Sequence, residues 1–118
     1  MMEYEPIGEV SITDADAALV RNSADELSRV VIAVALYSED LAWAQNFCIR
    51  LAGHANNNVR GNAVLGFGHL ARRFGSLDRA RVQTHIEHAL SDDDKWVRGQ
   101  AESAAGDVEH FLGWKLAR

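Results

Sequence analysis

Two histidines, His85 and His88, have the spacing that would best suit metal chemistry in this chain. Residues three apart lie near each other on one face of a helix, so both imidazoles would point the same way. A zinc site needs a third ligand and usually a carboxylate or carbonyl behind each ring. Glu87 lies between the two histidines and points elsewhere. We therefore expect no metal and no cofactor, and we interpret the pair as a solvent-facing polar edge.

The single cysteine, Cys48, is the next candidate for chemistry. It falls beside Phe47 and Leu51 on an apolar helical stripe, where a free cysteine behaves as a small hydrophobe. A lone cysteine excludes an internal disulfide and fits a reducing compartment. No nucleophile motif and no serine–histidine–aspartate arrangement can be read from the sequence. We expect a packed core thiol and a protein that is not an enzyme.

The acidic run Asp92, Asp93 and Asp94 is the third candidate, as a site for a divalent cation. A calcium loop needs alternating ligands and a distant glutamate, and the run has neither. Acidic residues do complement the N-terminus of a helix. The run therefore predicts a helix-capping turn.

These residues belong to a repeat, which indicates the elements that position them. The segments Val59–Ala63 and Val97–Ala101 have nearly the same sequence, and each follows a polar cluster. Their separation of about 40 residues, with helical texture, is typical of stacked helix pairs. Such pairs cannot bury their apolar faces alone, so they stack and present a surface to a partner.

Helix start and stop signals divide the rest of the chain, and no strand pattern appears after residue 12. Ser23 with Glu26 forms a capping box, Thr13 or Asp14 is placed to cap an earlier helix, and Asp40 a later one. The sequence predicts a single all-α domain over 1–118, because the chain is too short for two cores. Its parts are an irregular arm over 1–12, N-terminal helices over 13–37, a first repeat over 40–75 and a second over 76–113.

Glycines recur inside the second helix of each repeat, although each costs about 1 kcal/mol relative to alanine in a helix interior. A cost repeated at matching positions suggests close helix–helix approach, where any side chain would collide. We therefore interpret these glycines as packing positions rather than a ligand cradle. They are Gly61, Gly66 and Gly68 in the first copy and Gly99 and Gly106 in the second.

A polar turn followed by Val-Arg, and by alanine four residues after the valine, resembles the HEAT-repeat family. The resemblance implies a right-handed stack of helix pairs in which turn acids and arginines form a polar ladder between repeats. Carried over to this chain, Arg60 and Arg98 would be the ladder arginines and Asp94 the turn acid. The first copy has Asn56 in place of that acid, which weakens the ladder where Arg60 would look for a charged partner.

The sequence of residues 59–72, followed by Phe-Gly-Ser-Leu-Asp at 74–78, resembles sequences of small bacterial HEAT-like proteins. Several of these are similar to immunity proteins of interbacterial toxin systems. That resemblance implies a protein that binds a toxin domain and blocks it. An alternative is a HEAT-like scaffold or assembly helper.

Charge is unevenly distributed in a chain whose net charge is −5. Residues 1–40 contain nine acidic residues and two arginines, and the remainder contains eight acidic and ten basic residues. An acidic N-terminal third favours a basic protein partner, such as a nuclease toxin, or is a solvated face. An overall acidic chain argues against nucleic acid, for which the basic cluster Arg72, Arg73, Arg79 and Arg81 is the strongest signal.

The expected partner-binding residues are acidic and polar side chains together with one tryptophan. Trp96, at a helix start, is either an interface anchor or a cover over the loop between helix pairs. The longest apolar run, eight residues, is too short to span a bilayer, and the acidic start does not match a secretory signal. We expect a cytoplasmic protein. The candidate partner-binding residues are Glu39, Asp40, His69, Asp92, Asp93, Asp94, Trp96 and Glu102.

Overall fold

The computed structural model describes residues 8–118, and within them the chain forms helices and no strands, which confirms the all-α prediction. Residues 1–7, most of the predicted arm over 1–12, lie outside the described part. The helices are α1 (Ile12–Arg21), α2 (Ala24–Tyr37), α3 (Leu41–Leu51), α4 (Asn57–Phe74), α5 (Arg79–Leu90) and α6 (Lys95–Leu112).

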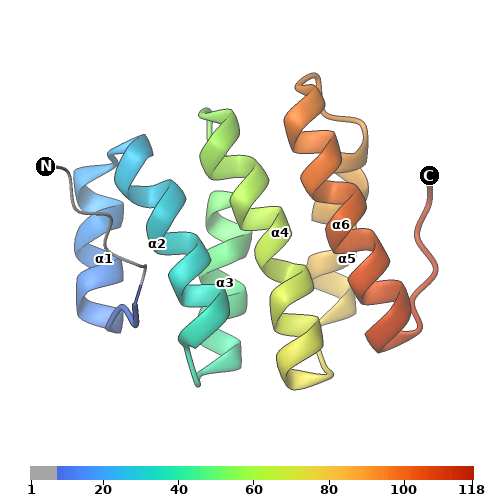
Figure 1. Ribbon diagram of the computed structural model, residues 1–118, viewed down its shortest axis with the longest axis horizontal. Coiled ribbons are helices and arrows are strands. Elements are labelled where there is room, and N and C mark those ends of the chain that lie inside the picture. Colours follow the sequence, from blue (N-terminus) through green and yellow to red (C-terminus); the bar gives the residue numbers. More distant parts are fainter. Residues whose placement is uncertain (1–7) are drawn as a thin grey trace, which may run out of the picture.

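The helices form two rows joined by short loops (Figure 1). Helices α2, α4 and α6 lie side by side in one row, α3 and α5 lie behind them, and α1 packs on α2. The loops after α1, α3 and α5 lie at one end of the helices, which we call the upper end as in Figure 1. The loops after α2 and α4 lie at the opposite, lower end.

Side-chain caps explain where most helices begin. Ser23, Asp40, Asn56 and Asp94 each accept a hydrogen bond from a backbone N–H in the first turn of the helix that follows. The first helix differs from the prediction, because Ser11 caps it by accepting a bond from Asp14 N at 3.0 Å. Thr13 and Asp14 are therefore inside α1, and the N-cap lies two or three residues earlier than predicted.

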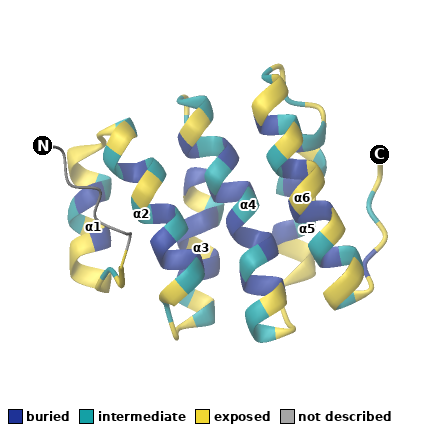
Figure 2. Ribbon diagram, in the orientation of Figure 1, coloured by how far each residue is buried: buried dark blue, intermediate teal, exposed yellow. Residues whose placement is uncertain are grey.

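The core is centred on α4, which contacts α2, α3, α5 and α6 (Figure 2). Its inner face contributes Val59, Phe67 and Leu70, all fully buried. Burial of large apolar side chains contributes about 1.5–3 kcal/mol each. Because other helices surround α4, its backbone comes close to theirs. Glycine is needed at the points of closest approach, where a side chain would not fit.

The glycines of α4 lie at close helix contacts, as predicted. A Cβ at Gly66 would lie 2.9 Å from Cys48 Sγ, and a Cβ at Gly61 or Gly68 would collide with α6. The same prediction is wrong for Gly99 and Gly106. No atom lies within 4 Å of a Cβ built at either position, since these glycines face outward from the last helix.

Candidate partner-binding site

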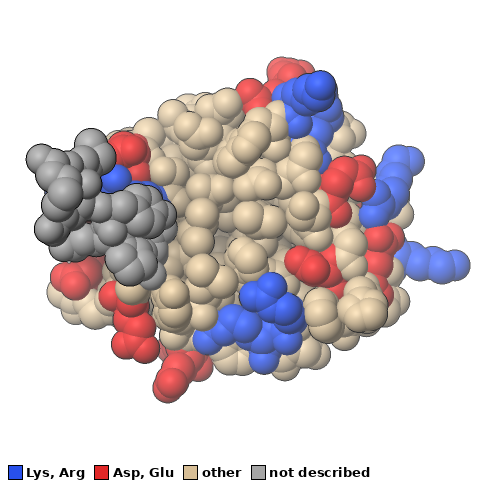
Figure 3. Space-filling view, in the orientation of Figure 1, with Lys and Arg blue, Asp and Glu red and all other residues tan. Residues whose placement is uncertain are grey.

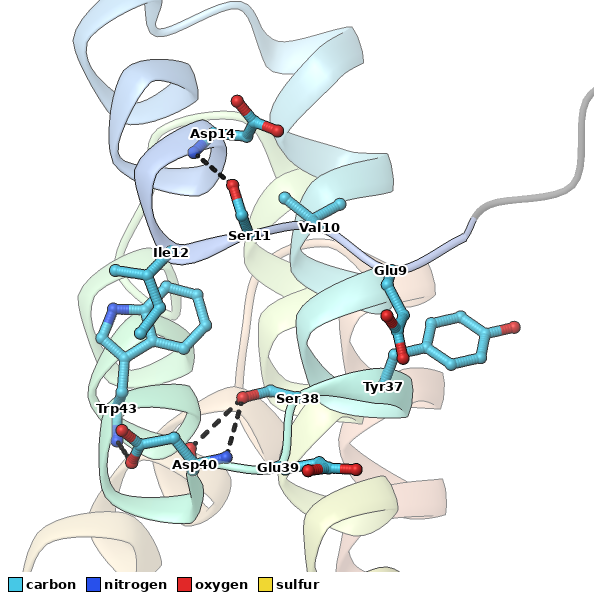
Figure 4. Close-up of a pocket in the computed structure, with 10 residues that line it drawn as sticks. All are labelled: Glu9, Val10, Ser11, Ile12, Asp14, Tyr37, Ser38, Glu39, Asp40 and Trp43. Atoms are coloured by element: carbon cyan, nitrogen blue, oxygen red, sulfur yellow. Dashed lines mark hydrogen bonds between the residues drawn. The ribbon is translucent and has the colours of Figure 1, made fainter.

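A pocket of about 670 Å³ lies where the segment before α1 meets the end of α2 and the start of α3 (Figure 4). Its lining combines four acidic side chains with aromatic and aliphatic ones. The acidic members are Glu9, Asp14, Glu39 and Asp40. The remaining members are Val10, Ser11, Ile12, Tyr37, Ser38 and Trp43.

Local hydrogen bonds determine how the loop between α2 and α3 presents its carboxylates. The Ser38 hydroxyl accepts a bond from Asp40 N at 3.2 Å, which tightens the loop. Asp40 caps α3 by accepting a bond from Trp43 N at 3.0 Å. Glu39, between them, is exposed and makes no hydrogen bond to another described residue. The loop therefore fixes Asp40 and leaves Glu39 available to a partner.

The apolar part of the pocket comes from Ile12, Tyr37 and Trp43. Trp43 is half-buried and packs against Phe47, with ring centroids 5.4 Å apart. Ile12 is 46% exposed and Tyr37 is 42% exposed, so both present apolar surface to solvent. An apolar wall beside carboxylates suits a lysine or arginine, whose aliphatic stem packs on the wall and whose charged end meets the acids.

The acidic pocket is at the lower end of the helices, and four other predicted binding residues are at the upper end. Asp92, Asp93 and Asp94 form the loop between α5 and α6, and Trp96 begins α6. Figure 3 shows one set of acidic side chains at the lower left of the view and others at the upper right, where the loop before α6 lies. The structure therefore separates the predicted residues into two groups.

Most of the upper group makes contacts within the protein. Asp92 accepts two bonds from Arg60, and Asp94 accepts bonds from Asn57 Nδ2 at 2.8 Å and Val97 N at 3.1 Å. Hydrogen bonding by Arg60 holds the pKa of Asp92 below its ordinary value, and hydrogen bonding by Asn57 does the same for Asp94. The carboxylate that pairs with Arg60 is therefore that of Asp92, and not the Asp94 carboxylate predicted for the ladder.

Trp96 packs against α4 rather than over the loop between the helix pairs, and its role as an interface anchor stays a prediction. It is 43% exposed, and its ring covers the backbone of α4 at Gly61. Packing against α4 fixes one face of the ring. The exposed remainder is available for contact at the upper end.

His69 and Glu102 lie apart from both groups, on α4 and α6. His69 is partly buried, its Nδ1 atom has no hydrogen-bond partner among the described residues, and burial lowers its pKa. Glu102 pairs with Arg118, which also bonds Glu109 at 2.6 Å. Neither residue adjoins the acidic pocket.

The histidine and the cysteine that were considered for chemistry pack against other parts of the protein. His85 stacks on Phe67 with ring centroids 6.3 Å apart, and burial lowers its pKa. The prediction that His85 belongs to a solvent-facing edge is therefore wrong in part, because one face of its ring is packed. Cys48 is buried, and burial raises its pKa to about 12. Within residues 8–118 no group of three or more His, Cys, Asp or Glu side chains could hold a metal ion.

Two arginines of the basic cluster Arg72, Arg73, Arg79 and Arg81 make contacts within the protein. Arg73 donates to the carbonyls of Ala35 at 2.8 Å and Ser38 at 2.7 Å, at the end of α2. Arg79 bonds Gln83 and lies over the Trp114 ring. Two of the four arginines therefore support the fold.

The sequence analysis missed the apolar wall of the pocket and two of its acidic residues, Glu9 and Asp14. The acidic excess of residues 1–40 was the available signal, since all four pocket acids belong to it. That excess did not show that Glu9 and Asp14 would lie beside Glu39 and Asp40. The signal was compositional, and the juxtaposition depends on how α1 packs against α2.

Among the described residues, no helix combines the length and hydropathy needed to cross a membrane. No protein-family model matches the sequence, and no curated protein matches it. The fold is similar to that of a chain in the crystal structure of a CDI complex from Cupriavidus taiwanensis LMG 19424. The TM-score is 0.78 at 25% identity, over 94% of this chain and 98% of the other.

Proposed function

We propose that this protein is an immunity protein, which binds a toxin domain and blocks its activity without catalysing a reaction itself. The observation that carries the proposal is the fold shared, over nearly the full length of both chains, with a chain of a CDI complex. Complexes of this kind pair a toxin with its immunity protein. Because the two chains are only 25% identical, we do not transfer the partner of the other chain to this one. The surface that recognises the toxin is therefore inferred from this structure.

The acidic pocket is the surface that we propose for the toxin. Its carboxylates and exposed apolar side chains fit a basic side chain of the partner. Complementary charge raises the rate of association and disfavours wrong partners. We infer that a basic toxin, such as a nuclease, inserts a lysine or arginine there and is blocked by occlusion of its active site. The proposed site of action is the cytoplasm, where the lone thiol would stay reduced.

The direct test combines binding and toxicity with the toxin domain of the cognate system. We expect a tight complex with one copy of each chain, and survival of cells that produce the toxin together with this protein. Unchanged toxicity in the presence of excess protein, with no complex detected by calorimetry, would overturn the proposal. Recovery of a biosynthetic enzyme as the stoichiometric partner would instead favour a HEAT-like scaffold.

A pair of charge reversals tests the pocket itself. Glu39→Lys places a positive charge on the exposed member of the pocket and breaks no hydrogen bond among the described residues. Asp25→Lys makes the same change in net charge at the other end of α2, on an exposed residue. We expect Glu39→Lys to weaken toxin binding at least about tenfold and Asp25→Lys to leave it nearly unchanged. Equal effects would show that net charge, rather than the pocket, governs binding.

A further inference from the structure

The loops at the upper end repeat the same hydrogen bonds, one helix pair after another. In the loop before α4, His54 Nδ1 accepts a bond from Asn56 N at 3.0 Å, and its Nε2 meets Asn22 Oδ1 at 2.9 Å. In the loop before α6, Asp92 Oδ1 accepts a bond from Asp94 N at 2.9 Å. Asp92 also reaches back, to Arg60. Each loop thus closes on itself and bonds to the preceding helix pair.

Two arginines of the repeat are held in the same way by their own loops. Arg60 Nη1 donates to the carbonyls of His54 and Ala55, both at 3.1 Å. Arg98 Nη1 donates to the carbonyls of Asp92 and Asp93, at 2.7 and 3.2 Å. In both cases the carbonyls belong to the residues six and five positions earlier. The loop therefore fixes the orientation of each guanidinium before any partner arrives.

The two arginines differ at the opposite edge of the guanidinium. Nε and Nη2 of Arg60 bond both oxygens of Asp92, from the next loop along the stack. Arg98 belongs to α6, and within the described residues no further helix pair supplies it with a corresponding loop. Among residues 8–118 no acidic side chain forms an ion pair with Arg98, and the two loop carbonyls are the only hydrogen-bond acceptors of its side chain.

The segment after α6 does not fill this position. It starts at the lower end and runs back along α5 and α6. Lys115 O accepts bonds from Arg79 and Gln83, Ala117 N donates to Glu87, and Arg118 pairs with Glu102, which lies one helical turn from Arg98. Gln45 makes the corresponding contact one repeat earlier, to Asp78 N at 2.8 Å. The tail thus lies alongside α5 and α6, where a next repeat would pack (Figure 1), but none of its residues forms a hydrogen bond or an ion pair with Arg98.

We propose that the Nε–Nη2 edge of Arg98 is a receptor for a carboxylate side chain of the toxin, which continues the pairing that Asp92 makes with Arg60. A planar guanidinium with two parallel donors matches a carboxylate, and here its orientation is already fixed. A second copy of this chain is a poorer occupant, because end-to-end stacking would not close and would give filaments. The identity of the partner as a toxin rests on the proposed function, whereas the receptor rests only on these contacts.

The receptor is tested first in the free protein, by nuclear magnetic resonance of isotope-labelled arginine side chains. The probe is a short poly-glutamate peptide with blocked ends. We expect the Nε–H signal of Arg98 to move and saturate, while that of Arg60, whose edge is occupied by Asp92, stays in place. Arg50, which is exposed, measures nonspecific attraction. A shift at Arg98 no larger than at Arg50, or a larger one with a DNA oligonucleotide, would overturn the receptor.

The toxin assay then tests the occupant. Arg98→Lys keeps the positive charge but removes the fork, and Arg50→Lys is the matched control. We expect Arg98→Lys to weaken binding roughly tenfold while the variant stays folded at the assay temperature, with a lower melting temperature because it loses the bonds of Nη1 to the two loop carbonyls. Wild-type affinity in Arg98→Lys would overturn this inference and leave the proposed function standing. Absence of toxin binding by the wild-type protein would overturn the proposed function and the toxin as occupant, and the peptide titration would still decide the receptor.

Discussion

Arg60 and Asp92 form a two-bonded ion pair that joins the helix pair α3–α4 to the loop before α6. Arg60 Nε lies 2.7 Å from Asp92 Oδ2 and Nη2 lies 2.9 Å from Oδ1. The Arg60 side chain is 20% exposed and the Asp92 side chain 10%, so both charges are largely withdrawn from water. Parallel bonds of this kind are among the strongest that side chains form.

Replacing Asp92 by asparagine should destabilise the fold. The change removes the charge that Arg60 faces, and a charged hydrogen bond contributes about 1.5–3 kcal/mol. We expect the free energy of unfolding to fall by about 2 kcal/mol in urea denaturation. Asp93→Asn is the control, because Asp93 is exposed and its side chain makes no bond to a described residue. Equal losses in the two variants would show that the ion pair contributes little.

The same pair should make stability depend on pH in acid. Hydrogen bonding by Arg60 lowers the pKa of Asp92 in the folded protein, whereas an aspartate in the unfolded chain has a pKa of about 3.9. A lowered pKa contributes stability that is present above the unfolded value and is lost as the pH falls through the folded one. Stability should therefore decline below about pH 4, and Asp92→Asn should reduce that decline. Urea denaturation across this range measures it; a pH-independent difference between the proteins would contradict the assignment.

Glycine-to-alanine changes should have opposite signs on α4 and α6. At Gly66 the added carbon would lie 2.9 Å from Cys48 Sγ and 3.2 Å from Ala35 Cβ, inside the core. Overpacking costs about 1–3 kcal/mol, which exceeds the gain in helix propensity. Gly106 has no atom within 4 Å of that carbon, so Gly106→Ala should stabilise by about 0.5–1 kcal/mol. Thermal unfolding of both variants measures this, and a stabilised Gly66→Ala would contradict the close contact.

Cys48 should not react with thiol reagents while the protein is folded. Burial raises its pKa to about 12, so the thiolate is rare at neutral pH and the sulfur is inaccessible. We expect disulfide-exchange reagents to label the protein only after denaturant is added. Rapid labelling of the native protein would show that α3 opens locally. Cys48→Ala then serves as the control for labelling elsewhere.

Local signals were sufficient to predict the helical class and most helix starts. Ser23 and Asp40 cap helices as their types and spacing indicated, because a cap depends on a few consecutive residues. The expectation of a weakened ladder at Arg60 is wrong, because both oxygens of Asp92 pair with it. The HEAT-like pattern implied only that Arg60 would belong to a ladder between helix pairs. It did not identify Asp92 as the partner, since three adjacent aspartates differ only in how the loop turns each carboxylate.

The acidic pocket and the receptor at Arg98 were decided by tertiary structure. Sequence periodicity treats Gly61 and Gly99, or Arg60 and Arg98, as equivalent positions. The fold makes them different, because α4 is enclosed by neighbours and α6 ends the stack. In the same way, Glu9 and Glu39 share a pocket only because α1 packs on α2. Caps and apolar periodicity are local and can be read from the sequence, whereas a surface depends on which elements have no further neighbour.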